Sequence, residues 1–217
     1  MRIIFITDIH GATGAIDKLP EADLLLVGGD FVTLGDDCAV RSAVKEIEKR
    51  FPAFLGVSGN MDPATADAVL AEGRHLLPSS APTIIDGLGM AGLGGANRSP
   101  FNTPNEWDDT QAARKLETLQ ENAVHILVTH APPMGSGADR ISSGANVGSA
   151  AIADAARRIK PALLLCGHIH EAAGIYRMGP TIIVNPGQFG DEGRYADIRW
   201  AQDGRPSVWL AKANTAG

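Results

Sequence analysis

Five apolar segments constrain the fold of this chain more than any other feature of its sequence. They read RIIFIT (2–7), ADLLLVGG (22–29), AFLGVSG (53–59), VHILVT (124–129) and PALLLCG (161–167). None alternates cleanly between polar and apolar residues, as a strand with one face in water would. Runs of this kind are typical of central strands covered on both faces, so they predict a sheet flanked by helices.

Helical patterns between these segments predict four helices. The helices are expected at residues 37–50, 63–72, about 104–122 and about 148–160. Asp36 or Asp37 is available to cap the first helix. Asp62 precedes Pro63 and is expected to cap the second, while Thr103 is expected to open the third.

Turn signals predict three antiparallel strand pairs in addition to the central strands. The turns fall at Asp86-Gly87, Gly179-Pro180 and Asp203-Gly204, each between apolar stretches. Strand and helix alternate in the first half, and the last fifty residues are mainly antiparallel strand. The sequence thus predicts an α/β fold.

The composition predicts a single domain over residues 1–217. A chain of 217 residues can bury roughly 70% of the surface that its unfolded form exposes. The net charge of −6, without a basic stripe, argues against general affinity for nucleic acid or anionic membranes. Cys38 and Cys166 lack the spacing of a zinc or redox motif, so both are expected to be reduced thiols in a cytosolic protein. The N-terminal apolar run is too short for a signal peptide or membrane span.

Two motif matches do not have the context that their usual functions require. Residues 87–92, GLGMAG, fit a dinucleotide-binding pattern but follow a hairpin turn and lead into no helix. We interpret them as glycines in a tight antiparallel pair. GVSGN lacks one glycine of a nucleophile elbow, and no serine connects with an Asp and His pair in hydrolase order.

A potential metal ligand follows the end of each apolar segment. The seven candidates, in chain order, are Asp8, His10, Asp30, Asn60, His130, His168 and His170. In open sheets with helices on both faces, ligands bind beyond the carboxyl ends of the strands. The seven side chains are therefore predicted to converge in one crevice.

Each candidate also has an ordinary structural explanation when it is taken alone. Asp-x-His occurs by chance, Asp30 could cap a turn, Asn60 could be a turn amide and His130 a core histidine. His168 and His170 are two residues apart, so at a strand end both rings can face the same side. The joint placement favours a metal site, and it leaves His75 and His125 as surface or structural residues.

Seven ligands are too many for one catalytic zinc ion and suit two ions that share a carboxylate. Imidazole and oxygen ligands without thiolate favour transition metals over calcium or magnesium, with manganese as the first expectation and iron, zinc, nickel or cobalt as alternatives. Two divalent cations would leave the site with a net positive charge, which favours a phosphate ester. They would also supply a hydroxide for in-line attack.

The chain resembles the calcineurin-like metallophosphoesterases in five short blocks, which are, in chain order, DIH, GGD, GN, TH and GHIH. It is similar to a small prokaryotic branch of that family in THAPP, GHIHE and NPG. The resemblance covers Asp8 to about Gly187. It implies a four-layer sandwich with two mixed sheets between helices. It also implies that Asp8, His10, Asp30 and His170 hold one ion, and that Asp30, Asn60, His130 and His168 hold the other, with Asp30 as the bridge. Asp30, Asn60 and His130 are accordingly expected to contribute to catalysis.

The chain departs from the family pattern at Met61, where many members have a histidine that contacts phosphate or protonates the leaving group. Methionine can do neither. Its presence implies a substrate with a better leaving group, another residue that supplies the proton, or modest catalysis. The full ligand set together with the missing histidine leads us to expect a phosphodiester rather than a monoester. Asn97 and Arg98 are the better candidates for phosphate contacts, and Arg140 is a weaker one. The ordinary interpretation of each is a loop residue without such a contact.

Two alternatives to this hydrolase stay open in the sequence. The chain could be a metal-binding or scaffold protein of the same fold with little or no catalysis, or a dinuclear hydrolase of amides or thioesters. The natural small phosphate-ester substrate is not encoded in any readable motif. A homo-oligomer is possible, because Trp200 and Trp209 could pack internally or at an interface.

Overall fold

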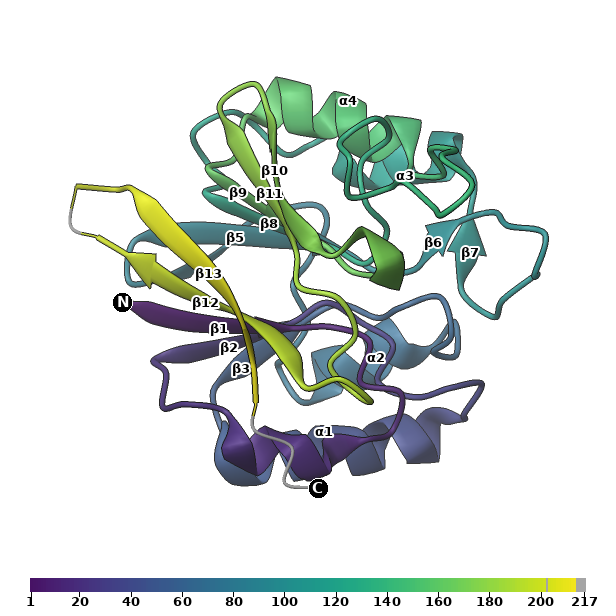
Figure 1. The fold of residues 1–217 in the computed structure, drawn as a ribbon, viewed down its shortest axis with the longest axis vertical. Helices are drawn as coiled ribbons and strands as arrows, with labels where there is room; N and C mark the ends of the chain where they lie inside the picture. Colours follow the sequence, from purple (N-terminus) through teal and green to yellow (C-terminus); the bar gives the residue numbers. More distant parts are fainter. Residues whose placement is uncertain (202, 214–217) are drawn as a thin grey trace.

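Two mixed sheets lie face to face in the middle of the molecule, and helices cover the outer face of each sheet (Figure 1). The structure, a computed structural model, describes residues 1–201 and 203–213. Gln202, in the last predicted hairpin, and residues 214–217 of the predicted 1–217 domain lie outside the described residues. The arrangement confirms the expected four-layer α/β sandwich.

The first sheet contains the three strands that form from the first three apolar segments. Its order is β13-β12-β1-β2-β3, in which β1, β2 and β3 are parallel and β12 and β13 are antiparallel to their neighbours. The strands are β1 (Arg2–Ile6), β2 (Leu24–Val27), β3 (Phe54–Gly56), β12 (Arg194–Trp200) and β13 (Pro206–Lys212). Because β1 to β3 are parallel, the loops after them leave from the same edge.

The second sheet contains the strands of the other two apolar segments and two of the predicted hairpins. Its order is β10-β11-β9-β8-β5-β4, with β11, β9, β8 and β5 parallel. The strands are β4 (Thr83–Ile85), β5 (Leu88–Leu93), β8 (Ile126–Thr129), β9 (Leu163–Leu165), β10 (Gly174–Met178) and β11 (Thr181–Asn185). GLGMAG lies mostly on β5, which pairs antiparallel with β4 and parallel with β8. The short strands β6 (Ala96–Asn97) and β7 (Glu106–Trp107) form a separate pair.

Alternate side chains of β1 explain why both faces of its sheet are covered. Ile3 and Phe5 join the core between the two sheets, and Ile4 and Ile6 join the core under the helices. All four are fully buried. Burying a side chain of this size contributes about 1.5–3 kcal/mol, so both faces of the strand favour the layered arrangement.

In the part of the chain that the structure describes, four α-helices and two 3-10 helices complete the layers. They are α1 (Asp37–Arg50), α2 (Ala66–Glu72), α3 (Asp109–Leu116), α4 (Ala150–Ile159), η1 (Thr13–Lys18) and η2 (His170–Ala172). Helices α1 and α2 lie with β1 to β3, while α3 and α4 lie over the second sheet (Figure 1). The Asp36 carboxylate accepts a hydrogen bond from the Ala39 N–H, which confirms the predicted cap of α1. No helix within residues 1–201 and 203–213 is long and apolar enough to cross a bilayer.

Two predicted helix starts are wrong. Asp62 does not cap α2, which begins four residues later; its buried carboxylate instead accepts hydrogen bonds from the Gly59 and Val32 N–H groups, at 2.8 and 3.0 Å. The third helix begins at Asp109 rather than near Thr103, because Glu106 and Trp107 form β7 and the Asp108 side chain caps the helix. A long-range contact with Val32 outweighs the cap signal at Asp62, whereas a stronger local cap at Asp108 replaces the one at Thr103.

Candidate metal centre

All seven predicted ligands lie on loops that leave the carboxyl ends of parallel strands. The loops follow β1 (Asp8, His10), β2 (Asp30), β3 (Asn60), β8 (His130) and β9 (His168, His170). Three of these strands belong to the first sheet and two to the second. The site therefore lies where the edges of the two sheets meet.

The backbone is strained at four of these positions. Asp8, His10, Asp30 and His168 have φ angles of 57°, 51°, 52° and 67°, in the left-handed region that residues with a Cβ rarely adopt. Each costs on the order of 1 kcal/mol and persists only where the surroundings impose it. Such strain is concentrated at functional sites, and here it falls on residues chosen independently as ligands.

Two glycines allow the backbone to approach the ligand carboxylates. A Cβ on Gly59 would lie 2.0 Å from Oδ1 of Asp30, and one on Gly167 would lie 2.4 Å from Oδ2 of Asp8. Neither position has room for a side chain. The glycines of the GN and GH blocks thus allow close packing around Asp30 and Asp8.

Asp8 contacts two of the predicted histidine ligands. Its Oδ1 lies 3.0 Å from Nε2 of His170 and 3.9 Å from Nε2 of His10. Its Oδ2 accepts hydrogen bonds from Oγ1 of Thr7 and the His168 N–H, at 2.8 and 3.2 Å. One oxygen is therefore held by the protein, and the other faces the imidazole nitrogens.

Asp30 lies between two groups of histidines. Its Oδ2 is 3.8 Å from Nε2 of His10 and 3.5 Å from Nε2 of His130. Its Oδ1 accepts a hydrogen bond from the Met61 N–H at 2.8 Å. The position between both groups is the one that a bridging carboxylate requires, and Oδ2 is the oxygen that faces them.

The hydrogen bonds of His130 direct its Nε2 into the site. Its Nδ1 is 2.8 Å from the Gly28 carbonyl oxygen, which can only accept, so Nδ1 carries the proton. The Nε2 atom lies 2.8 Å from Oδ1 of Asn60. In the neutral ring both of these atoms present lone pairs, an arrangement that a shared cation stabilises. The His168 ring packs edge-on with its centroid 5.2 Å from that of His130.

These donors fit divalent metal ions. Ligand atoms of Asp8, His10 and His170 lie within 4.8 Å of one another, as do those of Asp8, Asp30 and His130. Within residues 1–201 and 203–213, Oδ1 of Asp8 is a buried oxygen with no hydrogen-bond partner, because its approach to His170 lacks hydrogen-bond geometry. Leaving such an oxygen unsatisfied costs about 1–3 kcal/mol or more. A cation bound there would satisfy it.

Burial and neighbouring charges shift the pKa values of several predicted ligands. Burial raises the pKa of Asp30 to about 7, although the charge of His130 opposes this. Burial also raises the pKa of Asp8, but the contact with His170 and the charge of His130 outweigh it, so the net direction is downward. Burial lowers the pKa of His168 to about 4. A buried carboxylate that resists ionisation and a histidine that resists protonation both favour an external cation.

His168 and His170 do not continue a strand, contrary to the reasoning from their spacing. His168 lies in a left-handed turn after β9, and His170 begins η2. Their rings accordingly have different neighbours, since His168 packs on His130 while His170 packs edge-on against His10 at 5.7 Å. Each ring faces a different part of the centre.

The other two histidines have structural contacts, as expected. His75 is buried, with Nδ1 3.0 Å from the Phe54 carbonyl oxygen and Nε2 2.8 Å from Glu48. His125 Nδ1 accepts a hydrogen bond from the Gly89 N–H at 2.9 Å. Neither lies among the predicted ligands.

A cleft of about 550 Å³ opens over the centre. Its lining residues are His10, Asp30, Leu34, Asn60, Met61, Phe101, Asn102, Thr103, His168 and His170. Sequence reasoning missed Leu34 and the three residues at 101–103. The apolar Phe101 within the polar loop SPFNTP was the available signal, since a large apolar residue seldom belongs in such a loop without a contact.

The predicted substrate contacts lie elsewhere. Asn97 donates a hydrogen bond from Nδ2 to the Val147 carbonyl oxygen, and the Arg98 guanidinium is 3.7 Å from Asp108. Neither residue lines the cleft over the centre. Their role as phosphate contacts remains a prediction.

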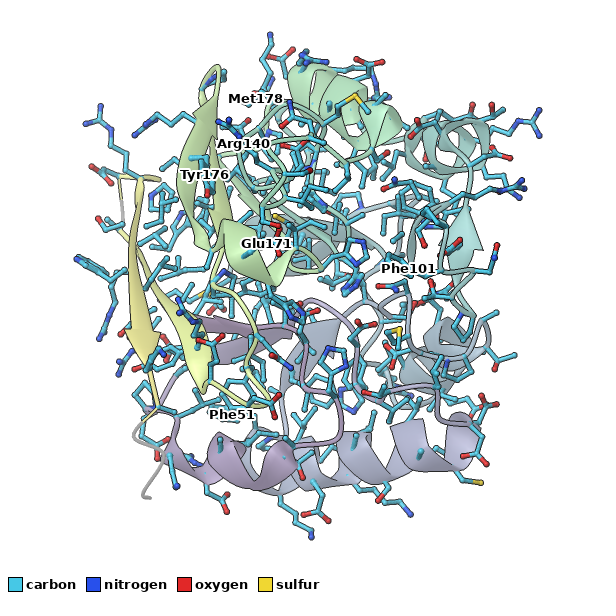
Figure 2. The ribbon with its side chains drawn as sticks, turned by 45° about the vertical axis from the view of Figure 1, so that its right-hand side comes forward. Phe51, Phe101, Arg140, Glu171, Tyr176 and Met178 are labelled. Atoms are coloured by element: carbon cyan, nitrogen blue, oxygen red, sulfur yellow. The ribbon has the colours of Figure 1, made fainter. Side chains whose placement is uncertain are left out.

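A second cavity of about 520 Å³ lies beside η2. Arg140, Glu171 and Tyr176 are among its lining residues, and Figure 2 shows these three close together beside the green 3-10 ribbon and β10. The Glu171 carboxylate accepts a hydrogen bond from the Ser142 N–H. Arg140 thus lines this cavity rather than the cleft over the metal ligands.

Residues 1–201 match the model of the calcineurin-like phosphoesterase superfamily domain. An uncharacterised protein of Methanocaldococcus jannaschii is 33% identical over 199 residues, which are 86% of this chain and 88% of that protein.

Solved structures share the fold at low sequence identity. A protein of Thermus thermophilus has a TM-score of 0.72 at 16% identity, with 98% of this chain and 99% of that one covered. A phosphopantetheinyl hydrolase of Mycobacterium tuberculosis has a TM-score of 0.64 at 17% identity, covering 86% of this chain and 89% of that one. At these identities the matches establish the fold alone.

Proposed function

The chain belongs to the calcineurin-like phosphoesterase superfamily, and from this membership we propose that it is a phosphodiesterase that depends on two divalent metal ions. The observation that carries the proposal is the placement of Asp30. One oxygen of its carboxylate lies within 4 Å of imidazole nitrogens from both groups of predicted ligands. A bridging carboxylate is the feature that a two-metal site requires.

The ligands would divide between the ions around this bridge. Asp8, His10 and His170 would hold the first ion, and Asn60, His130 and His168 would hold the second, with Asp30 shared. Two ions bound there would lower the pKa of a shared water and neutralise charge on the phosphate oxygens. The mixed imidazole and oxygen ligands favour manganese, with iron, zinc, nickel and cobalt as alternatives.

Several protein groups would prepare the site before any substrate arrives. The Gly28 carbonyl accepts from the Nδ1–H of His130 and so directs Nε2 of that ring at the centre. The Met61 N–H holds Oδ1 of Asp30, which leaves Oδ2 available to any ions that these residues would hold. Such preorganised contacts reduce the reorganisation that the reaction would otherwise require.

The side chain of Met61 supports a diester substrate. It lines the cleft but has no acidic proton, so it cannot protonate a poor leaving group. The dianion of a monoester would also meet no lysine or arginine in the described lining of this cleft. A diester has a single negative charge and therefore needs less positive charge from the site.

The proposal is tested with purified, manganese-loaded protein and two chromogenic esters. We expect hydrolysis of bis-p-nitrophenyl phosphate to exceed that of p-nitrophenyl phosphate, and Asp30→Ala to abolish both. Hydrolysis that favours the monoester would overturn the diester preference. Absence of hydrolysis despite bound manganese would instead support a metal-binding or scaffold protein of the same fold.

A further inference from the structure

Three apolar side chains are among the residues that line the cleft over the metal centre. They are Leu34, Met61 and Phe101, and we call them the apolar wall. Leu34 is 64% exposed and Phe101 is 84% exposed. Exposed apolar side chains are ordinary when they are scattered, but these three line one cleft together with predicted metal ligands. The wall would become buried only when something occupies the cleft.

The loop that presents Phe101 is fixed at both ends by Glu106. Oγ of Ser99 and Oγ1 of Thr103 donate hydrogen bonds to its Oε1 at 2.7 and 2.6 Å, and both N–H groups donate to the same carboxylate. Figure 2 shows Phe101 beside the pale teal arrow of the short strand pair. The loop is thus held in place before ligand arrives, which reduces the entropy cost of binding.

The cleft contrasts with a typical polyphosphate site in its charges. No lysine or arginine appears among its lining residues in the part of the chain that the structure describes. Arg98, on the same loop, is 73% exposed and faces Asp108 instead. A second or third phosphate group on the substrate would find no protein cation to neutralise it.

We infer that the substrate is a singly charged phosphodiester with an alkyl or aryl ester group that packs against Leu34, Met61 and Phe101. The inference rests on the proposed phosphodiesterase activity and names the substrate class of that site. The phosphate would lie over the metal ligands, and the apolar group would lie along the wall. A nucleoside polyphosphate would instead bring further negative charges that no lysine or arginine in the described lining of the cleft neutralises.

Alkyl 4-nitrophenyl phosphates from methyl to octyl test this inference, because the leaving group stays constant while the alkyl chain grows. Each methylene moved from water to an apolar surface can contribute up to about fourfold in kcat/KM, and about twofold on a half-open wall. We therefore expect kcat/KM to rise at least about tenfold across the series. The 4-nitrophenyl ester of thymidine 5′-monophosphate, with a polar group of similar bulk, should react more slowly than the octyl ester.

Variants show which side chains cause the dependence of kcat/KM on chain length. Leu34→Ser and Phe101→Ser should each reduce the octyl-to-methyl ratio, and Phe101→Leu should retain most of it. Ile84→Ser is the matched control, since Ile84 is also an exposed apolar residue, at 60%, but lies on the edge strand β4. It should leave the ratio unchanged.

The outcomes separate this inference from the proposed activity. Hydrolysis without any dependence on chain length, or an unchanged ratio in the Leu34→Ser/Phe101→Ser double variant, would overturn the apolar wall. If no ester is hydrolysed, the proposed activity fails. Calorimetry with the same esters then tests the apolar wall. Affinity that increases with chain length supports the wall, and affinity that stays constant would overturn it.

Discussion

Oγ1 of Thr103 lies 3.1 Å from Nδ2 of Asn60 and thereby fixes the orientation of a predicted metal ligand. The Thr103 hydroxyl has one proton and donates it to Glu106 at 2.6 Å, so it can only accept from the Asn60 amide. Oδ1 of Asn60 must then face His130 and the centre, at 2.8 Å. Burial raises the pKa of Glu106, but hydrogen bonds from Thr103 and Ser99 outweigh it and lower that pKa to about 2, so the acceptor stays ionised.

Thr103→Val should therefore weaken manganese binding by about 10- to 100-fold, the range typical of lost outer contacts to a metal ligand. Thr103→Ser keeps the hydroxyl and should retain binding within about threefold. Isothermal calorimetry on the metal-free protein measures both. Thr118→Val is a matched control, because the Thr118 hydroxyl donates to the Ser80 carbonyl oxygen instead. Equal affinities for Thr103→Val and wild type would contradict this role.

The raised pKa of Asp30 predicts a pH dependence of stability in the metal-free protein. Its pKa is about 7 in the folded state, against roughly 3.9 when unfolded. A raised carboxyl pKa gives stability that is present below about pH 4 and is lost as pH rises through about 7. Relative to Asp30→Asn, the wild type should therefore lose stability over that range. Urea unfolding with EDTA present measures the difference, and a gain with rising pH would count against the assignment.

Metal should reverse this trend, because the ionised carboxylate is the form that binds cations. The increase in Tm on adding manganese should be larger at pH 8 than at pH 5. Asp30→Asn should show only a small increase at either pH. A manganese effect that does not change with pH in the wild type would argue that Asp30 is not a ligand.

Most of the fold and of the centre could be predicted because parallel strands deliver their carboxyl ends to one edge. The apolar segments before Asp8, Asp30 and His168 show no alternation of polar and apolar residues, which is typical of central strands. The loops after these strands could therefore be placed together. The orientation of each ligand could not be predicted. It depends on contacts such as Thr103 with Asn60, 43 residues apart, that no local pattern encodes.

The errors have the same physical origin. Asp62 has the local sequence of a helix cap, yet it bonds the N–H groups of Gly59 and Val32 and so joins two ligand loops. Thr103 likewise resembles a cap but belongs to the loop that Glu106 holds. In both cases a side chain with the local sequence of a helix cap bonds groups outside the helix. Asp62 bonds backbone N–H groups, and the Thr103 hydroxyl bonds the side chains of Glu106 and Asn60.

Met61→His should increase turnover of esters with poor leaving groups. The Met61 N–H, rather than its side chain, contacts Asp30, so the substitution preserves that bond. A correctly placed acid contributes roughly 10²- to 10⁴-fold, and a newly introduced one should give about tenfold on alkyl leaving groups. Turnover of 4-nitrophenyl esters should change little, since that leaving group needs no proton. No gain on alkyl leaving groups would count against proton donation from this position.

The two cysteines should differ in reactivity. Cys38 is exposed, whereas Cys166, directly after β9, is fully buried, and burial raises the pKa of its thiol. Because only thiolate reacts, one thiol per native chain should react with 5,5′-dithiobis(2-nitrobenzoate), and two should react in urea. Cys38→Ser should abolish the native reaction. Rapid modification of both thiols in the folded protein would contradict the packing of β9.

A manganese titration of the metal-free protein, with bound metal and hydrolysis of bis-p-nitrophenyl phosphate measured on the same samples, tests the two-metal claim most directly. The account predicts that the rate rises to a plateau at two ions per chain and that Asp30→Ala neither binds two ions nor hydrolyses the ester. A full rate at one ion per chain, or two bound ions without hydrolysis, would contradict it.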